Sequence, residues 1–193
     1  MAWVPRFPEV KANLGLDNGA FGSLMSTGSI GAFFGLLTVG HVIHRFGAFR
    51  VTLASILLLF SSLGSLVHIR SSFLFLIVNI IFGFGITAVH VSLNSHGFHF
   101  LERSKINLIT STAGYWSAGS LATAIFSGVL VGRVDLITHI DALCIVLATA
   151  MIAIVLRLKS ELLEPNSDEE SHYSIKEIFT GFRIDWPTSL GMA

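Results

Sequence analysis

Long charge-free runs of apolar residues constrain this chain more than any other feature. A helix that crosses the hydrocarbon of a bilayer needs roughly 20 apolar residues, with about 17 to 25 as the usual range. Inside lipid only helices and closed barrels satisfy the backbone, and continuous runs exclude strands. The pattern predicts an all-α, polytopic membrane bundle of five transmembrane helices. The runs of 20, 17, 17, 27 and 15 residues, taken with their flanks, place the helices at 21–40, 51–67, 73–94, 106–132 and 137–158.

The composition excludes the common soluble classes of protein. Charged residues make up 12% of the chain, against about 25% in ordinary soluble domains. Hydrophobic residues make up 52%, and the mean hydropathy is +0.74. A soluble globule would have too little charged surface to cover so much apolar mass. The formal net charge is +0, so the sequence offers no basic stripe for nucleic acid.

Lysine and arginine residues in the short connections predict the orientation of the bundle. The excess lies with Arg45, Arg50, Arg103, Lys105, Arg157 and Lys159, against Arg6, Lys11, Arg70 and Arg133 on the other side. This bias places the first inter-helix loop and the C-terminal tail in the cytoplasm. We expect residues 1–20 to form an outer loop and the remnant of a first helix. Residues 159–193, which open with an acidic linker, are expected to form a cytoplasmic loop and the start of a next helix.

The connection between the first two predicted helices carries a recognisable pattern. Gly40 allows a helix to end, Gly47 allows a turn, and Arg45 and Arg50 hold the loop at the cytoplasmic face. These residues resemble G-x-x-x-D-R-x-G-x-x-[RK], the cytoplasmic loop signature of the major facilitator superfamily, with His44 in place of the aspartate. In that family the loop helps to latch neighbouring helices in the outward-facing state. A plain basic loop with helix breakers explains the same residues and stays open as an alternative.

Two further segments extend the resemblance along the chain. Asn79 to Gly85 is similar to R-x-x-x-G-x-G, a pattern of the family's fourth helix, with Asn79 in the arginine position. Asn94 and the segment from Gly114 to Gly119 resemble the fourth and fifth helices of a bacterial branch of sugar-type or efflux-type facilitators. The resemblance implies that the five helices are the second to sixth of twelve. The chain is then expected to be a fragment that lacks the first helix and the C-terminal half.

The resemblance also implies a function, which is secondary active transport by alternating access. The expected location is the bacterial cytoplasmic (inner) membrane. The implied partners are the lipid bilayer, a small-molecule substrate, a coupling proton and the C-terminal half of the same transporter. Enzyme activity, a cofactor and a metal are not expected.

Polar side chains recur on one face of two predicted helices. On the third, Asn79, Gly83, Thr87, His90 and Asn94 fall within roughly 80° of one another at about 100° per residue. Such faces line substrate pathways in transporters, and an ionisable residue inside the membrane is by default functional. Hydrogen bonds that hold the bundle together, and simple aromatic packing, remain open as alternatives. The predicted pathway residues are Asn79, His90, Asn94, Asn107, Thr110, Ser111, Tyr115 and Trp116.

Small residues mark a face of the first predicted helix. Gly28, Gly31 and Gly35 include a GxxxG pattern, which predicts close packing against another helix. No carboxylate lies deep in any of the five runs. His90 is therefore the candidate proton carrier among these helices, and a coupling residue on the helices expected to be missing is the open alternative.

Two other functions compete with transport. His41 and His44, and likewise His96 and His99 with Glu102 nearby, are spaced so that each pair could chelate one metal ion on a helix. A membrane-bound histidine-cluster metalloenzyme is therefore an alternative, although such sites use more ligands than these. The chain could also be an accessory membrane subunit that acts only with a partner.

Overall fold

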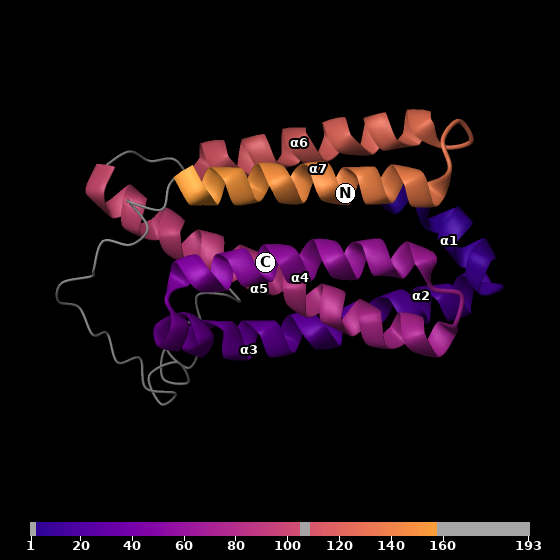
Figure 1. Ribbon diagram of the computed structural model, residues 1–193, viewed down its shortest axis with the longest axis horizontal. Coiled ribbons are helices and arrows are strands. Elements are labelled where there is room, and N and C mark those ends of the chain that lie inside the picture. The colour runs from indigo at the N-terminus through magenta and orange to yellow at the C-terminus, as the bar shows by residue number, and fades with distance from the viewer. Residues whose placement is uncertain (1–2, 105–108, 158–193) are drawn as a thin grey trace, which may run out of the picture. The chain divides into compact units, whose positions relative to one another are not determined.

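The described part of the chain consists of helices and contains no strand, which confirms the all-α prediction there. The computed structural model describes the backbone of residues 3–104 and 109–157, and the side chains of residues 3–95 and 114–157. Figure 1 shows the helices. In chain order they are η1 (Val4–Arg6), α1 (Phe7–Leu14), α2 (Asn18–Ser26), α3 (Gly28–Phe46), α4 (Ala48–His68), α5 (Ser72–Ser104), α6 (Ile109–Leu130) and α7 (Leu136–Arg157).

Four helical segments among the described residues are long and apolar enough to cross a membrane. They are Asn18–Phe46 (α2 with α3), Ala48–His68 (α4), Ser72–Ser95 (most of α5) and Leu136–Arg157 (α7). The fifth predicted span, 106–132, overlaps α6, whose first side chains lie outside the described residues.

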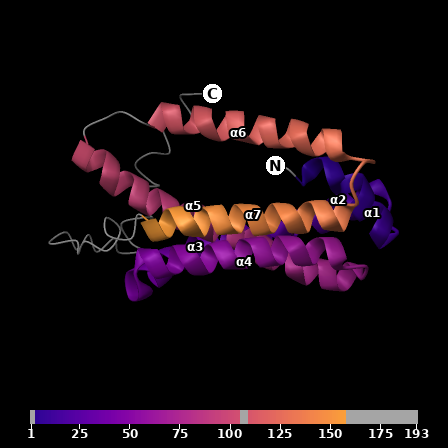
Figure 2. The ribbon, with the colours of Figure 1, turned by 45° about the horizontal axis from the view of Figure 1, so that its top comes forward.

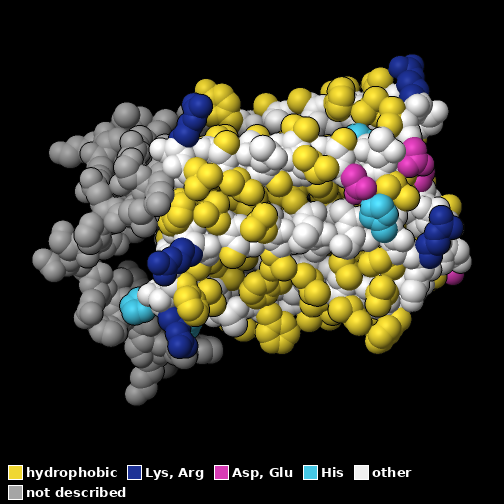
Figure 3. Space-filling model, in the orientation of Figure 1, with side chains coloured by type: hydrophobic (Ala, Val, Ile, Leu, Met, Phe, Trp, Pro, Cys, Tyr) yellow, Lys and Arg dark blue, Asp and Glu magenta, His cyan; other side chains and the backbone are white. Residues whose placement is uncertain are grey.

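The outer faces of these helices are apolar. Leu36 and Ile145 are each 67% exposed, and Phe33 is 60% exposed. On the face seen in Figure 3, hydrophobic side chains cover the middle of the helices, while charged side chains gather toward the two ends. A soluble protein rarely exposes so large a patch, whereas a lipid-facing surface requires one. The surface is therefore compatible with an integral membrane protein.

Helix α5 is the centre of the packing. It lies against both α3 and α4, and α4 in turn lies against α7. Helix α6 has its main contacts with η1 rather than with the long helices. In Figure 2, α6 runs along the outside of the group, with the N-terminal residues near one of its ends.

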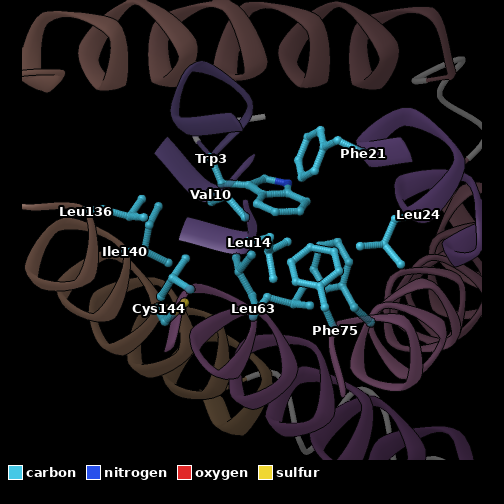
Figure 4. Close-up of a cluster of buried hydrophobic side chains, with 13 residues drawn as sticks. Trp3, Val10, Leu14, Phe21, Leu24, Leu63, Phe75, Leu136, Ile140 and Cys144 are labelled. Carbon is cyan, nitrogen blue, oxygen red and sulfur yellow. The ribbon is translucent and has the colours of Figure 1, made fainter. Parts of the chain in front are cut away.

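The largest hydrophobic cluster lies where the N-terminal segment meets the long helices, as Figure 4 shows. The Trp3 ring packs edge-on against Phe7, with ring centroids 4.6 Å apart, and against Phe82 of α5 at 5.4 Å. Val10 and Leu14, one turn apart on α1, are both buried in the same cluster. Burial of these side chains draws the N-terminal segment onto α5 and α7.

Residues 1–20, for which we expect an outer loop and the remnant of a first helix, are largely helical where the structure describes them. They contain η1, α1 and the start of α2. Pro5 and Pro8 are the second residues of η1 and α1, in the first turn, where a backbone N–H would have no helical partner. Prolines that look like breakers in the sequence therefore mark helix starts.

Candidate functional site

Helices α3 and α5 cross so closely that only glycine fits at the contact. A Cβ atom added to Gly31 would overlap the backbone of Ile80, and one added to Gly83 would overlap the backbone of Gly28. Without side chains at these points, the two backbones approach directly and gain dispersion contacts. The prediction that the small residues of the first span serve close helix packing is confirmed.

The side chain of Asn79 holds the junction between α2 and α3. At Thr27 the helix tightens, since its N–H donates to the Leu24 carbonyl at 3.2 Å. Asn79 is 1% exposed, and its Nδ2 donates to the carbonyls of Leu24 at 3.1 Å and Met25 at 3.0 Å. The two carbonyls lie where the regular hydrogen bonding of α2 ends, and the Asn79 amide gives each of them a further donor. Asn79 therefore has a structural role, since its side chain joins α5 to the junction of α2 and α3.

The polar stripe predicted on α5 divides into two parts. Its first part, which includes Thr87, faces α3, because a Cβ on Gly35 would meet the Thr87 side chain at 3.0 Å. Its second part, His90 and Asn94, is exposed. The His90 imidazole lies edge-on to the indole of Trp116 on α6, with ring centroids 6.5 Å apart. The exposed half of the stripe thus meets the predicted aromatic pair.

The aromatic pair itself is open to its surroundings. Tyr115 is 80% exposed and Trp116 is 56% exposed. The two rings therefore present an uncovered surface beside the exposed end of the α5 stripe. Three other predicted pathway residues, Asn107, Thr110 and Ser111, lie outside the residues whose side chains are described.

The segment Gly40–Arg50, which resembles the family's cytoplasmic latch loop and is the predicted gating loop, connects its two helices by a turn of one residue. We expected a helix to end at Gly40, and this expectation is wrong because α3 continues to Phe46. The chain turns at Gly47, which has φ 82° and ψ 143°, and α4 begins at the next residue. This backbone conformation is essentially restricted to glycine, whereas Gly40 is accommodated within the helix. Gly47 N–H donates to the Ile43 carbonyl at 2.8 Å and closes the last turn of α3.

The basic residues of this turn lie on the adjoining helix ends. His44 and Arg45 occupy the last turn of α3, and Arg50 follows Gly47 by three residues in α4. All three are exposed. The Arg45 guanidinium lies 5.5 Å from the centroid of the Phe46 ring, within the range of a cation–π contact. Two spans joined by so short a turn must move together at this end.

The histidines of the metalloenzyme alternative are only partly within the described chain. His41 and His44 are exposed on α3. His96, His99 and Glu102 lie outside the residues whose side chains are described. In the described part, no three His, Cys, Asp or Glu side chains gather where they could hold one metal ion.

A buried arginine ties the N-terminal segment to the connection between α6 and α7. Arg6 is 1% exposed, and its Nη1 donates to both carboxylate oxygens of Glu9, at 2.8 and 3.0 Å. Its Nη2 donates to the carbonyls of Leu130 and Val134, at 3.1 and 3.0 Å, and its Nε donates to His139 Nδ1 at 3.2 Å. These contacts use the full fork of guanidinium donors. Arg6 is therefore the main polar link between the N-terminal segment and the start of α7.

Sequence reasoning counted Arg6 only as a loop charge and did not identify this anchor. One signal was available, since Glu9 follows Arg6 at the i,i+3 spacing of a helical ion pair in a chain with few charges. The partners on the α6–α7 connection lie more than 120 residues further along, as the separations of 124 and 128 residues show. No local pattern encodes contacts at that distance in the sequence.

A second pair of polar side chains was also not identified. His68 ends α4, and Asp141 lies in the second turn of α7. The His68 Nε2 and Asp141 Oδ2 atoms are 2.9 Å apart. The pair sits in an open groove of about 870 Å³, hereafter the α4–α7 groove, which α5 also lines.

Comparisons with known proteins add no further assignment. No protein-family model, no curated protein and no solved structure matches this chain. The functional interpretation therefore rests on the sequence pattern together with the residues described above.

Proposed function

We propose that this chain forms the N-terminal half of a secondary active transporter of the major facilitator type, which moves a small solute by alternating access. The proposal is supported by four helical segments that are long and apolar enough to cross a membrane. It is also supported by the order of the motifs along the chain, from the Gly40–Arg50 signature to the glycines Gly83 and Gly85. The membrane would be the bacterial cytoplasmic membrane, with the C-terminal tail inside.

The observation that carries the proposal is the turn at Gly47. Two spans meet there with a single residue between them, and Arg45 and Arg50 stand exposed on either side. Exposed guanidinium groups at helix ends are free to bind and release carboxylates or carbonyls of a facing half. In the proposed mechanism, Arg45 and Arg50 make such contacts in one state and lose them in the other. His44 supplies a neutral or pH-dependent substitute for the family's acidic residue.

The proposed substrate pathway runs along the exposed surface shared by α5 and α6. His90, Asn94, Tyr115 and Trp116 offer two polar and two aromatic groups there. An aromatic ring can stack on a sugar ring or on a drug-like molecule, while the amide and imidazole fix its orientation. His90 is the proposed carrier of a coupling proton, since its imidazole has a ring nitrogen that can bind a proton.

The remaining parts of the transporter would belong to the same polypeptide. In this proposal a first helix precedes the described bundle and six helices form the second half. The cytoplasmic loop and start of a next helix expected at 159–193 lie outside the described residues. The two halves then rock against each other about a central cavity.

The gating assignment predicts a transport defect without loss of protein from the membrane. Arg45→Ala should slow transport about tenfold, the effect of one lost charge-assisted hydrogen bond worth about 1.4 kcal/mol. Gly47→Ala should slow it as well, because the backbone at φ 82° strains any other residue. The substrate is first identified as the solute whose cellular content changes when the full-length protein is produced.

Flux of that solute is then measured together with the amount of protein in the membrane. Arg157→Ala is the matched control, since Arg157 is an exposed arginine predicted on the same side, at the end of α7. It should leave the flux unchanged. Unchanged flux in both the Arg45 and Gly47 variants would overturn the gating assignment.

A further inference from the structure

The α4–α7 groove combines a polar end with an apolar wall. It is formed by the end of α4, the residues that connect α4 to α5, the start of α5 and the second and third turns of α7. Its volume of about 870 Å³ falls within the range of small-molecule sites, about 300–1,000 Å³. It lies at the ends of three membrane spans, where the hydrocarbon of a bilayer gives way to its headgroups.

The polar end of the groove carries groups of both charges. Asp141 binds His68 through Oδ2, and its Oδ1 accepts no hydrogen bond from the described residues. Arg70 also lines the groove, is exposed, and forms no ion pair with any described residue. The groove therefore offers one unpaired cation and a carboxylate oxygen that is still free to accept.

The wall of the groove is apolar and faces outward. Ile145 is 67% exposed and Leu74 is 51% exposed, and both line the groove with Phe60 and Val78. A soluble zwitterion would gain nothing from such a wall, whereas an acyl chain would bury against it at about 0.8 kcal/mol per methylene group. The wall thus favours a ligand that is charged at one end and has a long hydrocarbon at the other.

We propose that the α4–α7 groove binds a phospholipid with a primary ammonium headgroup, such as phosphatidylethanolamine. The lipid phosphate binds Arg70, the ammonium donates to Asp141, and an acyl chain lies along the wall of Phe60, Leu74 and Ile145. His68 holds the Asp141 carboxylate in place. The site is separate from the proposed substrate pathway on α5 and α6, and it requires membrane insertion but not transport.

The experiment titrates the purified full-length protein in detergent with three dioleoyl lipids, and native mass spectrometry counts the bound molecules. The lipids carry ethanolamine, choline or glycerol headgroups, so they share the phosphate and the chains. Phosphatidylethanolamine should bind about tenfold more tightly than the other two, because only its ammonium is both positively charged and able to donate hydrogen bonds to Asp141. Choline has no N–H, and the hydroxyls of glycerol carry no charge. Equal affinity for all three lipids would overturn the proposal.

Two variants separate the roles of the charges. Asp141→Asn should reduce the affinity for phosphatidylethanolamine to that of the choline lipid, without weakening the binding of phosphatidylglycerol. Arg70→Gln should weaken all three lipids about tenfold, because it removes the partner of their shared phosphate. Arg133→Gln is the matched control, since Arg133 is exposed in the α6–α7 connection and does not line the groove. An effect of Arg133→Gln equal to that of Arg70→Gln would show non-specific attraction and overturn the assignment.

A third variant fills the groove without replacing any of its charged residues. A Cβ on Gly64, which lines the groove, would lie 3.6 Å from Asp141 Oδ1, an ordinary contact. Gly64→Leu should therefore fold, as its unfolding temperature would show, and lose all three lipids. Retained binding in a folded Gly64→Leu protein would overturn the site.

Glycerophosphoethanolamine, which has no acyl chains, should bind at least tenfold more weakly than the whole lipid. Equal binding would overturn the lipid assignment in favour of a soluble phosphate ester.

Discussion

Replacement of Arg6 by alanine is expected to destabilise the bundle by about 3–5 kcal/mol, the usual cost of breaking a buried ionic network. The change removes the donors to the carbonyls of Leu130 and Val134 and leaves Glu9 without its partner. It also empties the space of a large side chain that is 1% exposed. The loss is measured from thermal or denaturant unfolding of the purified protein in detergent micelles.

The control for this prediction is the neighbouring Arg133, which is exposed in the α6–α7 connection. Arg133→Ala should change the unfolding free energy by about 0.5 kcal/mol or less. Arg6→Lys should fall between wild type and Arg6→Ala, because an ammonium keeps the charge but cannot reproduce the planar fork of donors. Equal stability of the Arg6→Ala and Arg133→Ala proteins would contradict the anchoring role.

The second large effect is expected at the crossing of α3 and α5. Gly31→Ala should destabilise the protein by about 3 kcal/mol, at the upper end of the usual range for overpacking. The new Cβ would overlap the backbone carbonyl of Ile80 rather than the tip of a side chain. The helices must therefore separate along their whole contact. Unfolding of the purified protein in micelles measures the change.

The same substitution elsewhere in α3 provides the control. Gly40 lies on α3 as well, and a Cβ there would have no neighbour within 4 Å. Gly40→Ala should stabilise the protein by up to about 1 kcal/mol, through helix propensity alone. The two variants differ only in position, so opposite signs would locate the effect at the crossing. A Gly31→Ala protein as stable as wild type would exclude the close contact.

The positions of the long helices could be predicted because charged or polar residues mark the ends of long apolar runs. The charge-free run 51–67 corresponds to α4, Ala48–His68, and the span predicted at 137–158 corresponds to α7, Leu136–Arg157. Charged or polar residues end each run, so the boundaries follow from the cost of placing a charge in hydrocarbon. The close packing of α3 against another helix was also predictable, because glycines at helical spacing form a face without side chains, on which a second backbone can approach closely.

Features that depend on distant residues could not be predicted. The junction of α2 and α3 at Thr27 lies inside a charge-free run, and Asn79 from another helix holds it. The Arg6 anchor joins residues more than 120 positions apart. At Gly40 the expected helix end is absent, because glycine in a helix costs only about 1 kcal/mol and the turn three residues after His44 supplies the break. A single sequence shows which residues are unfavourable in a helix, but it does not show which distant residue makes the contact that offsets the cost.

Helical spacing predicts which residues of α5 share a face, but not which neighbours that face contacts. Helical spacing places Asn79, Thr87 and His90 on one side, and the structure places the first two toward α2 and α3, with His90 exposed beside Trp116. Periodicity identifies which residues share a face, but it does not identify the neighbour that each part of the face meets. Proposals for the substrate pathway therefore concentrate on His90, Asn94, Tyr115 and Trp116.

The central claim is that these helices are one half of a two-half transporter, and the intact mass of the native polypeptide tests it most directly. The protein is isolated from its own membranes with an antibody against the N-terminal segment and weighed by mass spectrometry. The account predicts a mass of about twice the 20.9 kDa of this chain, which two six-helix repeats require. A native mass of 20.9 kDa would contradict the claim and favour a partner-dependent membrane subunit.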